Sequence, residues 1–161
     1  MLIYLRHGDD RGDDVYRHDR PLNDRGRKKA GKAADRLIEK YRHPDVVYVS
    51  PFRRALETLE AMYEHFERDV IVHRDRRIAQ HLSEKQQRAP QVSPETCAQV
   101  TLLEDRSAFR RRVAEHVDEA RRASGVVWCV THQAVIEEVA GHFGVKISGD
   151  LDFLDHIVML G

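Results

Sequence analysis

Features that mark several other classes of protein are scarce in this chain of 161 residues. It has two cysteines, Cys97 and Cys129, and their spacing matches neither a paired metal-binding motif nor a redox motif. A disulfide framework would also be unusual in a domain of this length. The apolar run at the N-terminus has five residues before Arg6, too few for a signal peptide or a membrane span. We therefore expect a soluble cytoplasmic protein that makes no contact with membranes.

Net charge is also absent, because 27 lysines and arginines balance 27 aspartates and glutamates. A chain without a large positive charge is not expected to bind nucleic acid, so any phosphate-binding site has to be local. Ten histidines suggest a metal site, but there is no His-Glu-x-x-His motif, no paired-cysteine spacing and no series of carboxylates. We expect neither a metal nor a cofactor.

Apolar spacing predicts strands and helices in alternation. Short β-branched or apolar runs predict strands at 2–5, 46–49, 70–72, 126–130 and 157–160, and spacings of three and four predict helices at 23–41, 54–65, 109–120 and 135–143. Asn23 can cap the first helix, Gly125 is expected to end the third, and the strand at 126–130 is expected to be central. The order indicates a three-layer α/β/α fold with a mostly parallel sheet of about five strands. One domain over 1–161 is predicted, with an irregular insertion at about 74–103.

Three of the predicted strands end in residues suited to phosphate. They run into Arg6-His7-Gly8, into Ser50-Pro51-Phe52-Arg53-Arg54 and into Thr131-His132. Because parallel strands bring their carboxyl ends to one edge of the sheet, these residues should converge. A guanidinium group can donate two parallel hydrogen bonds to the oxygens of one phosphate. A neutral imidazole is a competent nucleophile, and a glycine lets the backbone approach a bound phosphate closely. The pattern predicts a phosphate pocket with two imidazoles.

These segments resemble the histidine phosphatase superfamily, whose fold is also called phosphoglycerate mutase-like. Its opening strand carries an Arg-His-Gly signature, as at Arg6. The segment from Asp19 to Gly26 is similar to the family's Pro-Leu-Thr-x-x-Gly, and Ser50 to Ala55 to its Ser-Pro-x-x-Arg-Ala. Further matches are Glu104, Phe109 and Arg112, the family's spaced Glu, Phe and Arg, and Val130-Thr131-His132, its second catalytic histidine.

The resemblance implies roles for individual residues. Arg6, His7, Arg54 and His132 would form the phosphate pocket, with His7 as nucleophile and His132, if protonated, stabilising charge on the transferring group. Gly8, Asn23 and Gln133 would contact the substrate, although Asn23 and Gln133 stand where the family usually has Thr and Gly. Many members have a glutamate after the third strand as general acid, and Glu84 matches it best, with Asp75 and Asp9 as alternatives.

The predicted function is a metal-independent phosphatase that forms a phosphohistidine on His7 and hydrolyses it. The short chain resembles the small phosphohistidine phosphatases, so the partner is either a phosphoprotein or a phosphorylated small molecule. Two alternatives remain open: a phosphoglycerate mutase-type phosphotransferase, and a catalytically weak module that binds phosphate. The physiological substrate and the oligomeric state are not predicted.

Overall fold

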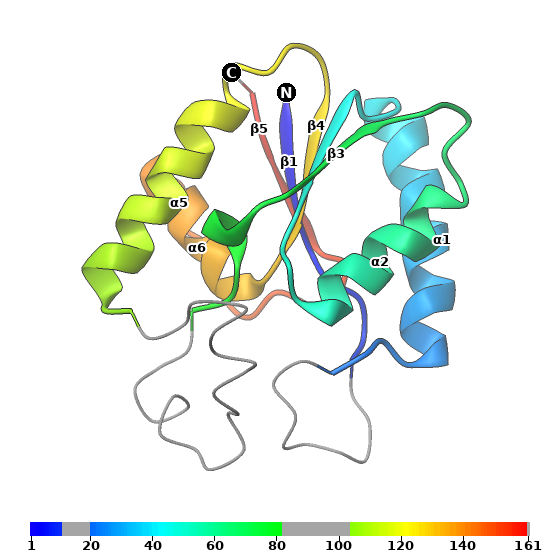
Figure 1. Ribbon diagram of the computed structural model, residues 1–161, viewed down its shortest axis with the longest axis horizontal. Coiled ribbons are helices and arrows are strands. Elements are labelled where there is room, and N and C mark those ends of the chain that lie inside the picture. Colours follow the sequence, from blue (N-terminus) through cyan, green and yellow to red (C-terminus); the bar gives the residue numbers. More distant parts are fainter. Residues whose placement is uncertain (11–19, 82–103, 161) are drawn as a thin grey trace.

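The computed structural model has a sheet of five strands with helices on both faces (Figure 1). The structure describes residues 1–10, 20–81 and 104–160. The strands are β1 Leu2–Arg6, β2 Val46–Val49, β3 Ile71–Arg74, β4 Val127–Thr131 and β5 His156–Met159. The helices are α1 Asp24–Tyr41, α2 Arg53–Tyr63, α5 Arg106–Ala120 and α6 Gln133–His142, with a 3₁₀ turn, η1, at Arg76–Ile78. The predicted α/β fold is confirmed.

The strand order is β3-β2-β4-β1-β5, which places β4 in the centre as expected. Strands β1, β2, β3 and β4 are parallel, and β5 pairs with β1 in the antiparallel direction. β4 is buried along its whole length, as a strand covered on both faces must be. The mostly parallel sheet of the prediction is therefore confirmed.

Alternation along each strand divides the core into two layers. Leu2 and Tyr4 of β1 pack with α5 and α6 on one face, whereas Ile3 and Leu5 pack with α1 and α2 on the other. In Figure 1, α5 and α6 lie on one side of the sheet and α1 and α2 on the opposite side. Both faces of the sheet are thus closed, so ligands can approach the strands only at an edge or an end.

The junction before α1 depends on a cap and on a glycine. The Asn23 side chain accepts a hydrogen bond from the Gly26 backbone N–H, which confirms the predicted cap. A Cβ atom on Gly26 would collide with the backbone of Asp9, so only glycine allows α1 to approach the segment after β1 so closely. This contact fixes the chain that follows His7.

Some boundaries differ from the prediction. β3 extends to Arg74, further than expected, because its parallel pairing with β2 continues to the residue opposite Val49. α5 ends at Ala120, and Gly125, with a φ of 87°, lies instead in the turn before β4. Most of the predicted insertion at 74–103 is outside the described residues, and the single-domain assignment stays a prediction.

Among the described helices, none is long and apolar enough to cross a membrane. The cytoplasmic location stays a prediction.

Candidate active site

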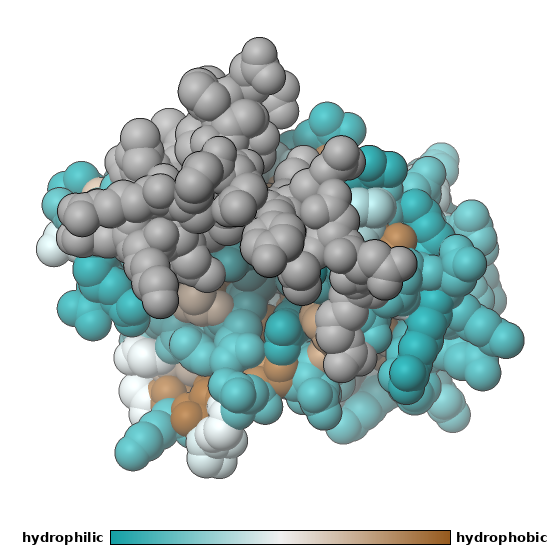
Figure 2. All heavy atoms as spheres, turned by 90° about the horizontal axis from the view of Figure 1, so that it is seen from below, coloured by the Kyte–Doolittle hydropathy of each residue, from teal (hydrophilic) through white to brown (hydrophobic). Residues whose placement is uncertain are grey.

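The carboxyl ends of β1, β2 and β4 meet at one end of the sheet, as the sequence predicts. Arg6 is in register with Thr131, and Val49 with Val130. Beyond these pairs the backbone N–H of His7 donates to the carbonyl of Thr131 at 2.9 Å, and that of Ser50 to the carbonyl of Val130 at 3.0 Å. Sheet register therefore brings His7 and Ser50 next to His132. Figure 2 views the molecule from this end, where the described surface is mostly hydrophilic.

His7 is buried and held in one tautomer. Its Nδ1 lies 2.8 Å from the carbonyl oxygen of Gly8, so Nδ1 carries the proton and donates to that carbonyl. Nε2 then has a free lone pair, which accepts a hydrogen bond from Arg54 Nε at 3.1 Å. Burial and the charge of Arg54 lower the pKa of His7 to about 3. The imidazole is therefore neutral at physiological pH, the state that a nucleophile needs.

His132 faces His7, with the two ring centroids 5.2 Å apart. Its Nε2 lies 2.7 Å from Ser50 Oγ, and its Nδ1 lies 3.4 Å from Arg54 Nη2, so Nε2 carries the proton and Nδ1 the lone pair. Burial and the charge of Arg54 hold the pKa of His132 well below its ordinary value. His132 is therefore neutral in the free protein, because burial and the arginine next to it disfavour a second positive charge, and the role that the resemblance implies for a protonated His132 requires it to gain a proton.

Two arginines supply the positive charge. Arg54 is buried, and besides contacting both histidines it donates to Gln80 Oε1 and lies 3.8 Å from Asp10. Arg6 donates to Gln133 Oε1 at 3.2 Å and to the carbonyl of Leu151. Its Nε is shielded from solvent and has no hydrogen-bond partner within the described chain. A buried guanidinium donor of this kind is suited to bind an anion.

Helix N-termini add to this positive field. α2 begins at Arg53, directly after β2, and α6 begins at Gln133, directly after His132. Neither residue that precedes these helices, Phe52 or His132, caps the helix with its side chain. The first backbone N–H groups and the positive ends of the two helix dipoles therefore face the same end of the sheet. Such ends favour phosphate.

A cavity of about 320 Å³ opens at this point, lined by Arg6, His7, Gln80, His81, His132, Gln133, Ala134 and Glu137. A larger hollow of about 450 Å³ lies between α1 and α2, but its described lining includes neither predicted catalytic histidine and neither predicted phosphate-binding arginine. The smaller cavity is therefore the candidate active site.

The predicted substrate-binding residues differ in where they lie. Gln133 lines the cavity and contacts Arg6. Gly8 does not line it; its N–H donates to Thr58 Oγ1 at 2.8 Å, and Thr58 Oγ1 donates to the carbonyl of Arg54 at 2.6 Å. Gly8 thereby ties the end of β1 to α2. Asn23 also lies outside the described lining and caps α1.

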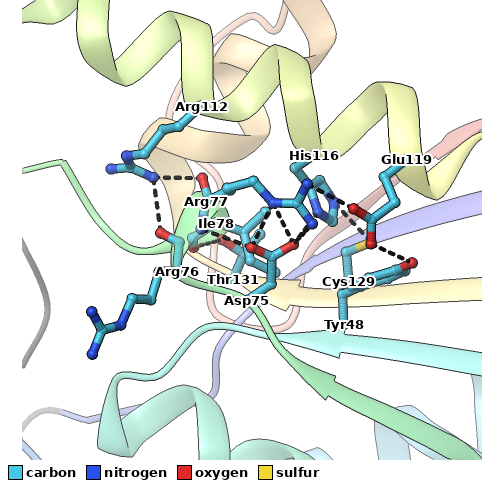
Figure 3. A network of polar contacts seen from close by, with 10 residues as sticks. All are labelled: Tyr48, Asp75, Arg76, Arg77, Ile78, Arg112, His116, Glu119, Cys129 and Thr131. Atoms are coloured by element: carbon cyan, nitrogen blue, oxygen red, sulfur yellow. Dashed lines mark hydrogen bonds and ion pairs between the residues drawn. The ribbon is translucent and has the colours of Figure 1, made fainter.

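None of the candidate general acids is in the described cavity. Glu84 lies outside the described residues. Asp75 is buried beneath α5, where its carboxylate accepts hydrogen bonds from His116 Nδ1 at 2.8 Å and from Arg77 (Figure 3). Burial alone would raise the pKa of Asp75, but the hydrogen bonds from His116 and Arg77 outweigh it and hold that pKa well below its usual range. Asp75 is thus an ionised structural residue, and Asp9 is buried outside the cavity lining.

Sequence reasoning missed several side chains of the site. Ser50 contacts His132, Gln80 accepts from Arg54, His81 lines the cavity, and Phe153 packs against Arg6 and His7. Ser50 was readable, since it begins a motif at a strand end. Gln80 and His81 follow a 3₁₀ turn without periodicity, and Phe153 arrives from the far end of the chain, so no local signal indicated them.

Comparison with known proteins agrees with this site. The family model of the histidine phosphatase superfamily, branch 1, matches residues 2–150. The chain belongs to this superfamily, so the prediction of a phosphatase is confirmed at that level. A comparison with curated proteins found no match.

Solved structures with this fold include several phosphatases. The native mycobacterial glucosyl-3-phosphoglycerate phosphatase is 22% identical with a TM-score of 0.69, over 96% of this chain and 87% of that one. A putative α-ribazole-5′-phosphate phosphatase from Escherichia coli is 18% identical with a TM-score of 0.63, and a phosphoserine phosphatase mutant from Entamoeba histolytica, bound to phosphoserine, is 16% identical with a TM-score of 0.59. Each of these two comparisons covers 90% of this chain and 80% of the other. At these identities the likeness concerns the fold.

Proposed function

We propose that this protein is a metal-independent phosphatase that hydrolyses a phosphomonoester or a protein phosphohistidine through a phosphohistidine intermediate on His7. The observation that carries the proposal is the state of His7: a buried, neutral imidazole whose Nε2 lone pair lies 3.1 Å from a buried guanidinium. A lone pair held in place beside a phosphate-binding cation is what in-line attack on phosphorus requires.

In the first step, a bound phosphate takes the place of His7 Nε2 as acceptor for the Arg54 guanidinium. The freed lone pair attacks the phosphorus, and the bond from phosphorus to the leaving group breaks. The carbonyl of Gly8 stabilises the positive charge that develops on the ring through Nδ1. Water then attacks the phosphorus and releases His7. These proposed steps need no cofactor. Among the described residues, no group of three or more His, Cys, Asp or Glu side chains is arranged to hold a metal ion.

The charges around the cavity support an anionic substrate. Arg6 and Arg54 bind the phosphoryl oxygens, and the two helix N-termini add partial positive charge. Burial and repulsion from Arg54 lower the pKa of His132, and the negative charge of an incoming phosphate dianion opposes both, so it favours the protonated form. We therefore expect His132 to gain its proton as the substrate binds.

The substrate class is either a phosphorylated small molecule or a phosphoprotein. The three structural neighbours described above are named for small phosphorylated compounds, namely glucosyl-3-phosphoglycerate, α-ribazole-5′-phosphate and phosphoserine, which supports the first class. The described surface at this end of the molecule is mostly hydrophilic, which agrees with polar substrates (Figure 2).

The test is turnover of p-nitrophenyl phosphate in the presence of a metal chelator, with acid-labile phosphoenzyme trapped by quenching. The wild type and the control His142→Ala, which changes an exposed histidine at the end of α6, should both hydrolyse the ester. His7→Ala should lose both turnover and the trapped phosphoenzyme while keeping its thermal unfolding transition. Turnover in His7→Ala equal to wild type would refute the mechanism. Tight phosphate binding without turnover would favour the binding module, and transfer to an added alcohol in preference to water would favour the phosphotransferase.

A further inference from the structure

A third histidine lines the cavity of His7 and has no role in the steps above. His81 follows Gln80, whose side-chain oxygen accepts a hydrogen bond from Arg54. The reaction needs one more group, because the oxygen or nitrogen that leaves the phosphorus has to take up a proton. His81 lies where such a group would act.

The surroundings of His81 hold its ring in a defined orientation. The ring stacks on Phe109 of α5, with centroids 4.7 Å apart and planes at 23°. Its Nδ1 is shielded from solvent, has no hydrogen-bond partner within the described chain, and lies 3.5 Å from Glu104 Oε1. Because Nδ1 is enclosed beside Glu104, Nε2 is the ring nitrogen left to contact a bound substrate.

Glu104 supplies a fixed negative charge. Arg112 Nε contacts both carboxylate oxygens at 2.9 Å, and the same guanidinium lies over the Phe109 ring, 4.8 Å from its centroid. The carboxylate is therefore held in place next to the imidazole, where it can balance the positive charge that His81 carries as a proton donor. A histidine oriented by a carboxylate is an arrangement that proton transfer uses.

The other described side chains are less suited to this step. Gln80 has an amide, which does not act as an acid. Glu137 is exposed to solvent, and its carboxyl group already accepts a hydrogen bond from Gln133 at 2.8 Å. Asp75 lies in the buried network beneath α5. Besides His7 and His132, which already have roles, His81 is thus the side chain in the described lining that combines a titratable group with an oriented, enclosed setting.

We propose that His81 is the proton donor to the leaving group, a role that rests on the proposed function. As the bond between His7 Nε2 and phosphorus forms, the bond from phosphorus to the leaving atom breaks. The leaving atom keeps the electron pair of that bond and takes a proton from His81 Nε2. In the second step water attacks the phosphohistidine, its proton passes to His81, and the N–P electron pair returns to His7. The sum is the hydrolysis of the substrate, with both histidines restored.

The experiment compares two aryl phosphates in His81→Phe, a variant that keeps a ring stacked on Phe109 but has no proton to give. p-Nitrophenolate leaves without help, whereas phenolate needs protonation. We expect kcat/KM for phenyl phosphate to fall by about 10²-fold or more, and for p-nitrophenyl phosphate to change by less than about threefold. The matched control is His73→Phe, because His73 also stacks on an aromatic ring, Tyr48, but lies exposed on β3.

Other outcomes overturn the proposal. Equal losses of kcat/KM with both esters would show that His81 has a structural role. An unchanged kcat/KM with both esters would show that His81 takes no part in the reaction. A selective loss in Glu84→Gln, with none in His81→Phe, would move the acid to Glu84. The proposed function is judged separately by His7→Ala: if that variant stays active, the phosphohistidine mechanism fails and the role of His81 fails with it. Trapped phosphoenzyme in the wild type together with an unselective His81→Phe overturns the role of His81 alone.

Discussion

Replacing Asp75 by alanine should destabilise the fold more than any change of an exposed charge. The carboxylate lies at the centre of a buried network in which Oδ1 accepts from the backbone N–H and Nε of Arg77, and Oδ2 from Arg77 Nη2 and His116 Nδ1 (Figure 3). His116 is completely buried, so water cannot replace the lost acceptor. Arg77 is partly exposed and keeps an ion pair with Glu119 at 2.8 Å.

The size of the effect follows from these partners. Leaving the buried Nδ1 of His116 without an acceptor costs about 1–3 kcal/mol. Losing the cap of η1 costs about 1 kcal/mol, and losing the solvent-screened pair with Arg77 costs less than about 1 kcal/mol. The sum is about 3 kcal/mol, which for a domain of this size lowers Tm by about 10 °C.

Urea and thermal unfolding at pH 7 measure this loss, with Asp118→Ala on the exposed face of α5 as the control. The control should stay within about 0.5 kcal/mol of wild type. The pKa of Asp75 is depressed in the folded state, so its contribution is complete above the unfolded pKa of about 4 and is lost as pH falls further. The gap between wild type and Asp75→Ala should therefore narrow in acid. A loss below about 1 kcal/mol at pH 7 would refute the reasoning.

Three further predictions concern the cavity. Arg54→Lys keeps the charge but removes the Nε donor to His7, so kcat/KM should fall about 10²–10³-fold with little change in Tm, and a loss below tenfold would argue against a bidentate role. Ser50→Ala removes the hydrogen-bond partner of His132 Nε2, so in steady-state kinetics kcat should fall and KM should change little; a rise in KM alone would indicate substrate binding instead. In an NMR titration of the free protein, the His7 ring should stay neutral from pH 7 to about pH 5, because its pKa is lowered to about 3, whereas a midpoint near 6.5 would contradict the buried site.

Much of the fold could be predicted from the sequence because apolar residues repeat with a different spacing in strands than in helices. The alternation of Leu2, Ile3, Tyr4 and Leu5 between two apolar layers reads as a buried strand, and Val127 to Thr131 reads the same way. The capping side chain of Asn23 set the start of α1. β3 was harder, since its residues are all exposed at the edge of the sheet and its end is fixed by pairing with β2 rather than by its own sequence.

Part of the site was readable for a different reason. His7, Arg54 and His132 follow strands or begin helices, so the geometry of a parallel sheet brings them together whatever lies between them. Their charge states were not readable. The neutral state of His132 follows from its burial beside Arg54, and a sequence does not state which arginine lies next to which imidazole.

Gln80 and His81 reach the cavity through contacts that no local pattern encodes. The segment after β3 is tied to β2 by the Asp75 N–H, which donates to the Val49 carbonyl at 2.9 Å, and to β4 by Thr131 Oγ1, which donates to the Ile78 carbonyl at 2.7 Å.

Arg112 adds a third tie by donating to the carbonyl of Arg77 (Figure 3). Its pairing with Glu104 links the same segment to the residue beside His81. The polar network beneath α5 thus does two things at once: it satisfies groups buried between α5 and the sheet, and it holds the chain that carries His81 against the cavity. Removing Asp75 should therefore loosen this segment as well as destabilise the fold. Its effect on phenyl phosphate should then exceed its effect on p-nitrophenyl phosphate at temperatures well below Tm, because a displaced His81 cannot protonate the leaving group.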